Sequence, residues 1–328
     1  ASLRQSRNGG FMDKPLEGIK IVEVAMWAFV PAAGGLLSDL GADVIKIEPP
    51  SGDPLRGLQI GGMGGDGPGR NTDFSWESYN RGTRSVTLDL KQQAGREVLM
   101  KLVDGADVFL TNLLPRARSA MGIDAESIRT AFPGIIYASG SGMGPNGPES
   151  DKGGYDAISY WARGSISATM TEDGATKPVG PPGPAFGDTA SGAMLAGAIC
   201  AALVKKLRTG KGSEVDVSLL GTAMWSMQRL ICQATQDQVL RFPRPANPVP
   251  HNVLVGNYAT SDGRFVSLCM LQADKYWKPF CEVAGRPDLA ADPRFVDQKA
   301  RRENVDACHA EMKALFASKP LAQWREIL

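Results

Sequence analysis

The chain has 328 residues, of which 43% are hydrophobic and 22% charged, and it carries 36 Lys and Arg against 35 Asp and Glu. This composition is typical of a globular protein and excludes intrinsic disorder as the main state. The even charge balance provides no net field for nucleic acid or an anionic membrane, so we expect neither as a partner. The five cysteines form no CxxC pair and there are only two histidines, so we expect no disulfide framework, no metal site and a reducing, cytoplasmic location.

The first half alternates between strand and helix patterns. Residues 19–24 predict a strand, Pro31 begins a helix that ends before Gly41, and residues 43–48 predict a second, parallel strand. Further elements are expected as strands at 84–90, 107–112 and 135–139 and a helix at 93–103, with a glycine-rich loop at 61–69. This alternation predicts an α/β fold with an open parallel sheet, helices on both faces and ligands at the carboxyl ends of the strands.

The second half begins with a helix at 192–206, which is too short for a bilayer and is expected to lie in the core. A strand at 214–219, a proline-dense segment at 241–250 and a hairpin at 258–271 follow. We therefore expect an artificial leader at 1–11, a large domain at 12–225, a linker at 226–250 and a smaller α+β domain at 251–328. The pattern stops inside an amphipathic helix, so the chain is expected to be cut short.

Two features leave alternatives open. Asp188 lies between glycines just before the predicted helix, and it is interpreted either as the residue that caps this helix or as a functional carboxylate. Trp27 and Trp225 are interpreted either as core residues or as the wall of a pocket for a bulky acid. Gly34 and Gly35 follow the first strand without the GxGxxG spacing, which argues against a nicotinamide site.

Several short runs, taken together and in order, resemble one family. They are PLEGIKIVE at 15–23, LGADVIKIE at 40–48, GD at 52–53, NRGTRS at 80–85, LDLK at 88–91, ADV at 106–108, GD at 187–188, TGKG at 209–212 and DGR at 262–264. The family is the class III CoA-transferases, which includes formyl-CoA and carnitine CoA-transferases and 2-methylacyl-CoA racemases. The resemblance implies a Rossmann-like large domain, a small domain, two interlocked chains in a homodimer, and a C-terminal return segment that is missing here.

The resemblance also implies the chemistry. Asp188 matches the family's nucleophile, which outweighs the capping interpretation, and the substrates would be an acyl-CoA and a carboxylic acid, with coenzyme A as the group transferred and no metal. The carboxylate would form a mixed anhydride with the acyl group and then an aspartyl-CoA thioester. This step needs an ionised Asp188, and we expect the side chain to be exposed and ionised near neutral pH.

Other site residues carry over less directly. The expected contacts to CoA are Leu88, Asp89, Leu90, Lys91, Asn112, Leu113, Gly140, Ser141 and Gly142, with Arg116 or Arg118 replacing arginines of the family. The expected substrate pocket consists of Trp27, Ala28, Phe29, Tyr155 and Asp156. Ala28 stands where formyl-CoA transferase has a glutamine, which argues against that particular activity.

Two alternatives remain. A 2-methylacyl-CoA racemase would need a base, but Tyr155 stands at the position of its histidine and Gln272 near that of its glutamate. Tyrosine has a pKa of about 10 and is a poor base near neutral pH, and glutamine is no base at all. The other alternative is a protein that binds CoA without turnover.

Overall fold

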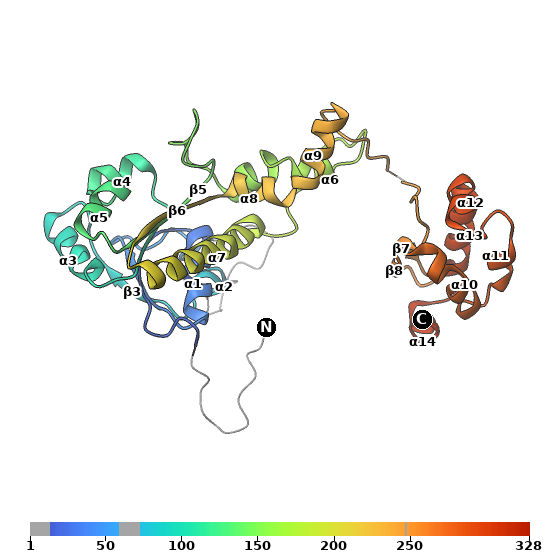
Figure 1. Cartoon of the computed structure of the whole chain (residues 1–328), viewed down its shortest axis with the longest axis horizontal. Helices are drawn as coiled ribbons and strands as arrows, with labels where there is room; N and C mark the ends of the chain where they lie inside the picture. Colours follow the sequence, from blue (N-terminus) through green and yellow to red (C-terminus); the bar gives the residue numbers. More distant parts are fainter. Residues whose placement is uncertain (1–13, 59–72, 247) are drawn as a thin grey trace, which may run out of the picture. The chain divides into compact units, whose positions relative to one another are not determined.

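The computed structural model describes residues 14–58, 73–246 and 248–328. It divides into two compact units, one up to Pro243 and one from Arg244 to Leu328 (Figure 1). The leader expected at 1–11 and the glycine-rich loop expected at 61–69 lie outside the described residues. Within the segment predicted as a linker, the structure has a helix, α9, at Gln228–Asp237.

The first unit is built on a six-stranded parallel sheet in the order β3-β2-β1-β4-β5-β6. The strands are β1 Lys20–Val24, β2 Asp43–Glu48, β3 Arg84–Thr87, β4 Val108–Thr111, β5 Ile136–Ser141 and β6 Ser213–Ser218. This is the strand order of the doubly wound Rossmann fold. The first three strands extend the sheet to one side of β1 and the next three extend it to the other side, so the strand order switches between β1 and β4. The predicted open parallel sheet is confirmed.

Helices cover both faces of this sheet, as the alternation of the strand residues requires. In β1, Ile21 packs into a core with helices α1 (Phe29–Asp39) and α7 (Phe186–Thr209). The next residue, Val22, points to the opposite core, which contains α3 (Gln93–Val103) and α5 (Ala125–Ala131). Figure 1 shows α1 and α7 on one side of the sheet and α3 and α5 on the other.

Shorter helices complete the first unit. They are α2 Phe74–Asn80, α4 Pro115–Met121, a π-helical turn η1 Ala157–Ala162, α6 Ile166–Met170 and α8 Leu219–Ser226. Most predicted boundaries differ from the structure by one to three residues, and the start of α7 differs by more. Helix α7 begins at Phe186 rather than 192, after Ala185 adopts a left-handed conformation with φ 53°. Strand β3 ends at Thr87 rather than 90, because Leu90 turns into the core beside α3.

Helix α7 is long and apolar enough to cross a membrane by length and composition alone. Its buried side chains, including Leu195, Ile199 and Leu203, pack into the same core as α1 and the sheet. One face of the helix therefore packs into this core, and 39% of its most apolar window is buried within the structure.

The second unit has a two-stranded antiparallel sheet, β7 Val255–Ala259 and β8 Phe265–Cys269, which confirms the predicted hairpin. The turn contains Gly263 at φ +72°, a conformation that favours glycine. Five helices follow: α10 Ala273–Val283, α11 Pro287–Ala291, α12 Gln298–Glu303, α13 Val305–Ala317 and α14 Leu321–Ile327. They enclose a separate core around Trp277, Phe316 and Trp324, so the unit is the predicted small α+β domain.

Candidate active site

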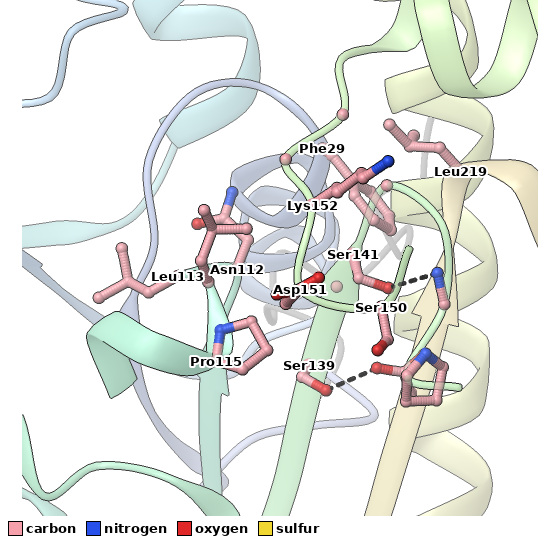
Figure 2. Close-up of a pocket in the computed structure, with 18 of the residues that line it drawn as sticks. Phe29, Asn112, Leu113, Pro115, Ser139, Ser141, Ser150, Asp151, Lys152 and Leu219 are labelled. Atoms are coloured by element: carbon pink, nitrogen blue, oxygen red, sulfur yellow. Dashed lines mark hydrogen bonds between the residues drawn. The ribbon is translucent and has the colours of Figure 1, made fainter. Parts of the chain in front are cut away.

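A cavity of about 560 Å³ opens at the carboxyl ends of the central strands (Figure 2). Its lining includes residues from the loop after β1 (Met26, Trp27), the loop after β4 (112–115), the end of β5 and the segment after it (139–155), the strand β6 and the first turn of α7. Strands β1 and β4 are the pair at which the chain reverses direction, and open α/β sheets bind their ligands at this point. The cavity is therefore the candidate active site.

Asp188 lies in this cavity, on the first turn of α7. The interpretation of Asp188 as the cap of the helix is wrong, because the capping position is Ala185 and that residue makes no side-chain cap. Asp156, from another segment, provides the cap instead: its Oδ2 accepts a hydrogen bond of 3.0 Å from the Gly187 N–H. The carboxylate of Asp188 is thus not used to satisfy the backbone of its own helix.

The ionisation of Asp188 also differs from the prediction. Burial, together with the neighbouring Asp156 carboxylate, raises its pKa from 3.8 to about 7. Asp156 is itself buried, and burial raises its pKa as well, against the lowering effect of the backbone N–H groups of residues 186–188. Asp188 is therefore an electrostatically coupled, partly buried acid, ionised in about half of the molecules at neutral pH.

Glycines allow α7 to approach the first helix closely. A Cβ atom on Gly192 would lie 2.7 Å from the Cβ of Ala32 and 2.9 Å from the backbone oxygen of Phe29. A Cβ on Gly187 would lie 2.3 Å from the ring of Tyr160. Gly192 thus allows α7 to pack closely against α1, and Gly187 allows its first turn to pack against η1.

That loop is fixed at two consecutive residues. The side-chain amide of Asn112 holds Met26 from both sides: Oδ1 accepts from the Met26 N–H at 3.0 Å and Nδ2 donates to the Met26 oxygen at 2.6 Å. The next residue, Trp27, has φ 69°, and its N–H donates to Asp53 Oδ1 at 3.0 Å. A left-handed backbone conformation at a residue other than glycine costs roughly 1–3 kcal/mol, and it persists only where the surrounding contacts hold it in place.

Asp53 belongs to a buried ionic cluster that the sequence reasoning missed. Lys46 Nζ lies 3.0 Å from Glu23 Oε1, 3.1 Å from Asp53 Oδ2 and 3.0 Å from the backbone oxygen of Ala25, and none of the three charged side chains is exposed to solvent. Glu48 extends the cluster by accepting from the Asp53 N–H at 3.0 Å. The available signal was the presence of charged residues inside the apolar strands β1 and β2, where an unpaired charge would be costly.

Two aromatic rings form part of the cavity wall. Trp27 and Tyr155 meet edge to face, with their ring centroids 5.5 Å apart and their planes at 88°. Trp225 does not line this cavity, and its side chain is 62% exposed on α8, so the core interpretation of this residue is wrong. Its apolar character alone did not show that it lies on the exposed face of α8.

The structure brings many, but not all, of the predicted site residues together. Those that line the cavity are Trp27, Phe29, Asn112, Leu113, Arg118, Gly140, Ser141, Gly142, Tyr155 and Asp188. Those outside the lining are Leu88, Asp89, Leu90 and Lys91 on the loop after β3, Arg116 on the surface of α4, and the buried Ala28 and Asp156. Gln272 lies in the second unit, directly before α10.

The polar lining residues indicate how the cavity can hold a ligand. Ser139 Oγ donates to Asp216 Oδ2 at 2.8 Å, and the Gly144 N–H donates to Ser141 Oγ at 3.1 Å (Figure 2). Arg118 and Lys152 are cations in the lining, and cations of this kind bind phosphate groups. Among residues 14–58, 73–246 and 248–328, no group of His, Cys, Asp or Glu side chains is arranged to hold a metal ion.

Comparison with known proteins decides the family. Residues 16–328 match the model of CoA-transferase family III. The chain belongs to CoA-transferase family III. It is 34% identical over 313 residues to (R)-2-hydroxy-4-methylpentanoate CoA-transferase of Clostridioides difficile, covering 95% of this chain and 77% of that protein.

Two further similarities support the assignment. The chain is 36% identical over 280 residues to cinnamoyl-CoA:phenyllactate CoA-transferase of Clostridium sporogenes, covering 85% of this chain and 66% of that protein. A crystal structure of Rv3272 from M. tuberculosis superimposes with a TM-score of 0.81 at 29% identity, covering 96% of this chain and 81% of that one. The protein is therefore a family III CoA-transferase, an enzyme that uses CoA thioesters.

Proposed function

We propose that this CoA-transferase moves CoA from an acyl-CoA to a carboxylic acid through covalent intermediates on Asp188. The observation that carries the proposal is a partly buried carboxylate in the cavity at the switch point of the sheet, with a pKa raised to about 7. Its helix is already capped by Asp156, so the Asp188 carboxylate is available for reaction.

In the first half-reaction, an Asp188 oxygen attacks the thioester carbonyl of the donor. The C–S bond breaks, CoA leaves as its thiolate, and the acyl group remains on Asp188 as a mixed anhydride. The thiolate then attacks the Asp188 carbonyl carbon of this anhydride. The donor acid leaves as a carboxylate and Asp188 carries CoA as a thioester, so that one difficult exchange is divided into easier steps.

The second half-reaction runs the same steps in reverse with the acceptor acid. The acceptor carboxylate attacks the aspartyl thioester, which regenerates a mixed anhydride and the CoA thiolate. The thiolate attacks the acceptor's acyl carbon, the new acyl-CoA forms and Asp188 returns to a free carboxylate. No base is needed to remove a carbon-bound proton, which favours transfer over racemisation.

The surroundings of Asp188 suit this chemistry. The first turn of α7 presents the positive end of the helix dipole, which favours the negative charge that develops on a tetrahedral intermediate. The Gly140–Ser141–Gly142 segment lines the same cavity. Arg118 and Lys152 are the cations that we assign to the phosphates of CoA.

The test is a transfer assay with acetyl-CoA and a panel of carboxylic acids, in which each new acyl-CoA is identified by mass. Asp188→Ala is expected to abolish transfer while changing the affinity for CoA by less than about threefold. Glu172→Ala removes an exposed carboxylate outside the cavity and is the matched control, with transfer as in the wild type. Transfer at an unchanged rate by the Asp188 variant would reject the assignment.

The quaternary structure is part of the proposal. We propose a cytoplasmic homodimer, on the basis of the family resemblance and of exposed apolar side chains on α8 and α9, such as Trp225 and Ile231. Its test is included with the predictions below.

A further inference from the structure

The backbone of Trp27 has an unusual conformation. Its φ of 69° lies in the left-handed region, which residues with large side chains rarely adopt. The conformation is held by the hydrogen bond from the Trp27 N–H to Asp53 Oδ1, and Asp53 is itself fixed by the buried Lys46. Strained residues that are held by their surroundings in this way cluster at functional sites, so the position of the Trp27 ring needs an explanation.

The conformation places the indole ring in the cavity that contains Asp188. There it meets Tyr155 edge to face, and Phe29 lines the same cavity. Tyr155 is 57% exposed, although it is paired with a ring whose backbone is rigidly held. The pair thus presents a preorganised aromatic wall whose apolar surface is not covered by the first unit.

The chemistry of this wall defines what it can bind. An aromatic ring gains edge-to-face or offset stacking with such a pair, and a branched alkyl group gains buried apolar area. A charged group gains less, because the wall offers it no ionic partner: among the described residues, no Lys or Arg side chain lies over the ring of Trp27 or Tyr155. A very small acid would leave the wall uncovered.

We propose that Trp27 and Tyr155 form the acyl subsite of the enzyme, that this subsite takes an acid with an aromatic or branched alkyl side chain, and that Trp27 is its specificity-determining residue. The proposal rests on the function proposed above, because it assumes that the acyl group is held near Asp188. The ionic cluster of Lys46 and Asp53 then acts as a positioning device, since it holds the backbone that carries the Trp27 ring.

The experiment measures binding in the Asp188→Asn variant, which retains the shape of the site without the nucleophile. Titration calorimetry with 3-phenylpropanoyl-CoA, acetyl-CoA and CoA gives three affinities. We expect 3-phenylpropanoyl-CoA to bind at least about tenfold more tightly than acetyl-CoA, because its phenyl ring can pack against the rings of Trp27 and Tyr155. Adding Trp27→Ala should reduce this preference to less than about threefold and leave the affinity for CoA unchanged.

Further variants keep the proposal falsifiable if Trp27→Ala does not fold. Tyr155→Ala truncates an exposed ring, and should also reduce the preference, whereas Trp27→Phe should retain most of it. Phe265→Ala removes an exposed aromatic ring outside the cavity, on β8, and should leave the preference intact. The proposal would be overturned if the Asp188→Asn variant bound the two acyl-CoA probes with equal affinity. It would also be overturned if the preference survived the loss of the Trp27 and Tyr155 rings.

The outcome is separable from that of the proposed function. Binding to the Asp188→Asn variant involves no transfer, so the aromatic preference can be present even if Asp188 is not the nucleophile. Conversely, wild-type transfer that depends on Asp188 but shows no preference among acyl groups would reject the subsite and leave the transfer mechanism standing.

Discussion

Replacing Asp188 by Asn is expected to stabilise the folded protein, and to do so more at alkaline than at acidic pH. In the folded state burial and Asp156 raise the pKa of Asp188 from 3.8 to about 7. An unfolded chain has the lower value, so the folded state binds more protons between these two pKa values. The free energy of unfolding therefore falls as the pH rises through this window, and Asn removes that fall because it does not ionise.

The magnitude follows from the size of the shift. A difference of about three pKa units corresponds to about 4 kcal/mol at pH 8, where Asp188 is ionised in both states, at about 1.4 kcal/mol per unit. At pH 4.5 the same calculation gives about 1 kcal/mol. The stabilisation by Asp188→Asn is therefore expected to be larger at pH 8 than at pH 4.5 by about 3 kcal/mol.

The assay is urea unfolding of the wild type and the variant at several pH values from 4.5 to 8, followed by circular dichroism. Glu172→Gln, at an exposed position, is the matched control and should change the free energy of unfolding by less than about 0.5 kcal/mol at every pH. A stabilisation that does not depend on pH would refute the raised pKa of Asp188. So would a variant that becomes less stable than the wild type as the pH rises.

Four other outcomes are expected. The rate of the first half-reaction should rise with pH through about 7, as Asp188 ionises, and a flat profile between pH 5 and 9 would contradict this. A 2-methylacyl-CoA incubated in deuterium oxide should gain no deuterium at the α-carbon on the timescale of turnover, whereas incorporation at that rate would favour the racemase. Gly192→Ala should destabilise the protein by roughly 1–3 kcal/mol, because its Cβ would meet Phe29 and Ala32, while Gly197→Ala, in open space on the same helix, should be neutral or stabilising. Sedimentation should give a homodimer, and a monomer for the chain extended to the length of its relatives would contradict the proposal.

The local sequence was sufficient to predict the central part of the fold. The apolar runs of β1 and β2 and the stop at Gly41 predict the β-α-β unit, and the structure has it at Lys20–Glu48. Strand–helix alternation then predicts a parallel sheet, and a parallel sheet predicts a site at the carboxyl ends of its strands. The cavity lies there, and it contains Asp188, which was singled out from its flanking glycines and the family resemblance.

The rest depends on contacts between residues that are distant in the sequence. Glu23 and Lys46 are direct neighbours in the register of β1 and β2, but Asp53 reaches Lys46 only through the loop that follows β2. The left-handed backbone of Trp27 is a consequence of this cluster and has no local sequence signal. The raised pKa of Asp188 likewise arises from burial and from Asp156, which a local pattern does not reveal.

In the proposed mechanism, Asp188 carries CoA as a covalent thioester during turnover. The most direct measurement is to incubate the enzyme with an acyl-CoA donor, trap it with hydroxylamine and identify the modified peptide by mass spectrometry. We predict a hydroxamate at Asp188, formed only in the presence of the donor and absent from the Asp188→Ala variant. Normal transfer with no hydroxamate at Asp188, or with the modification on another carboxylate such as Asp156, would contradict the account.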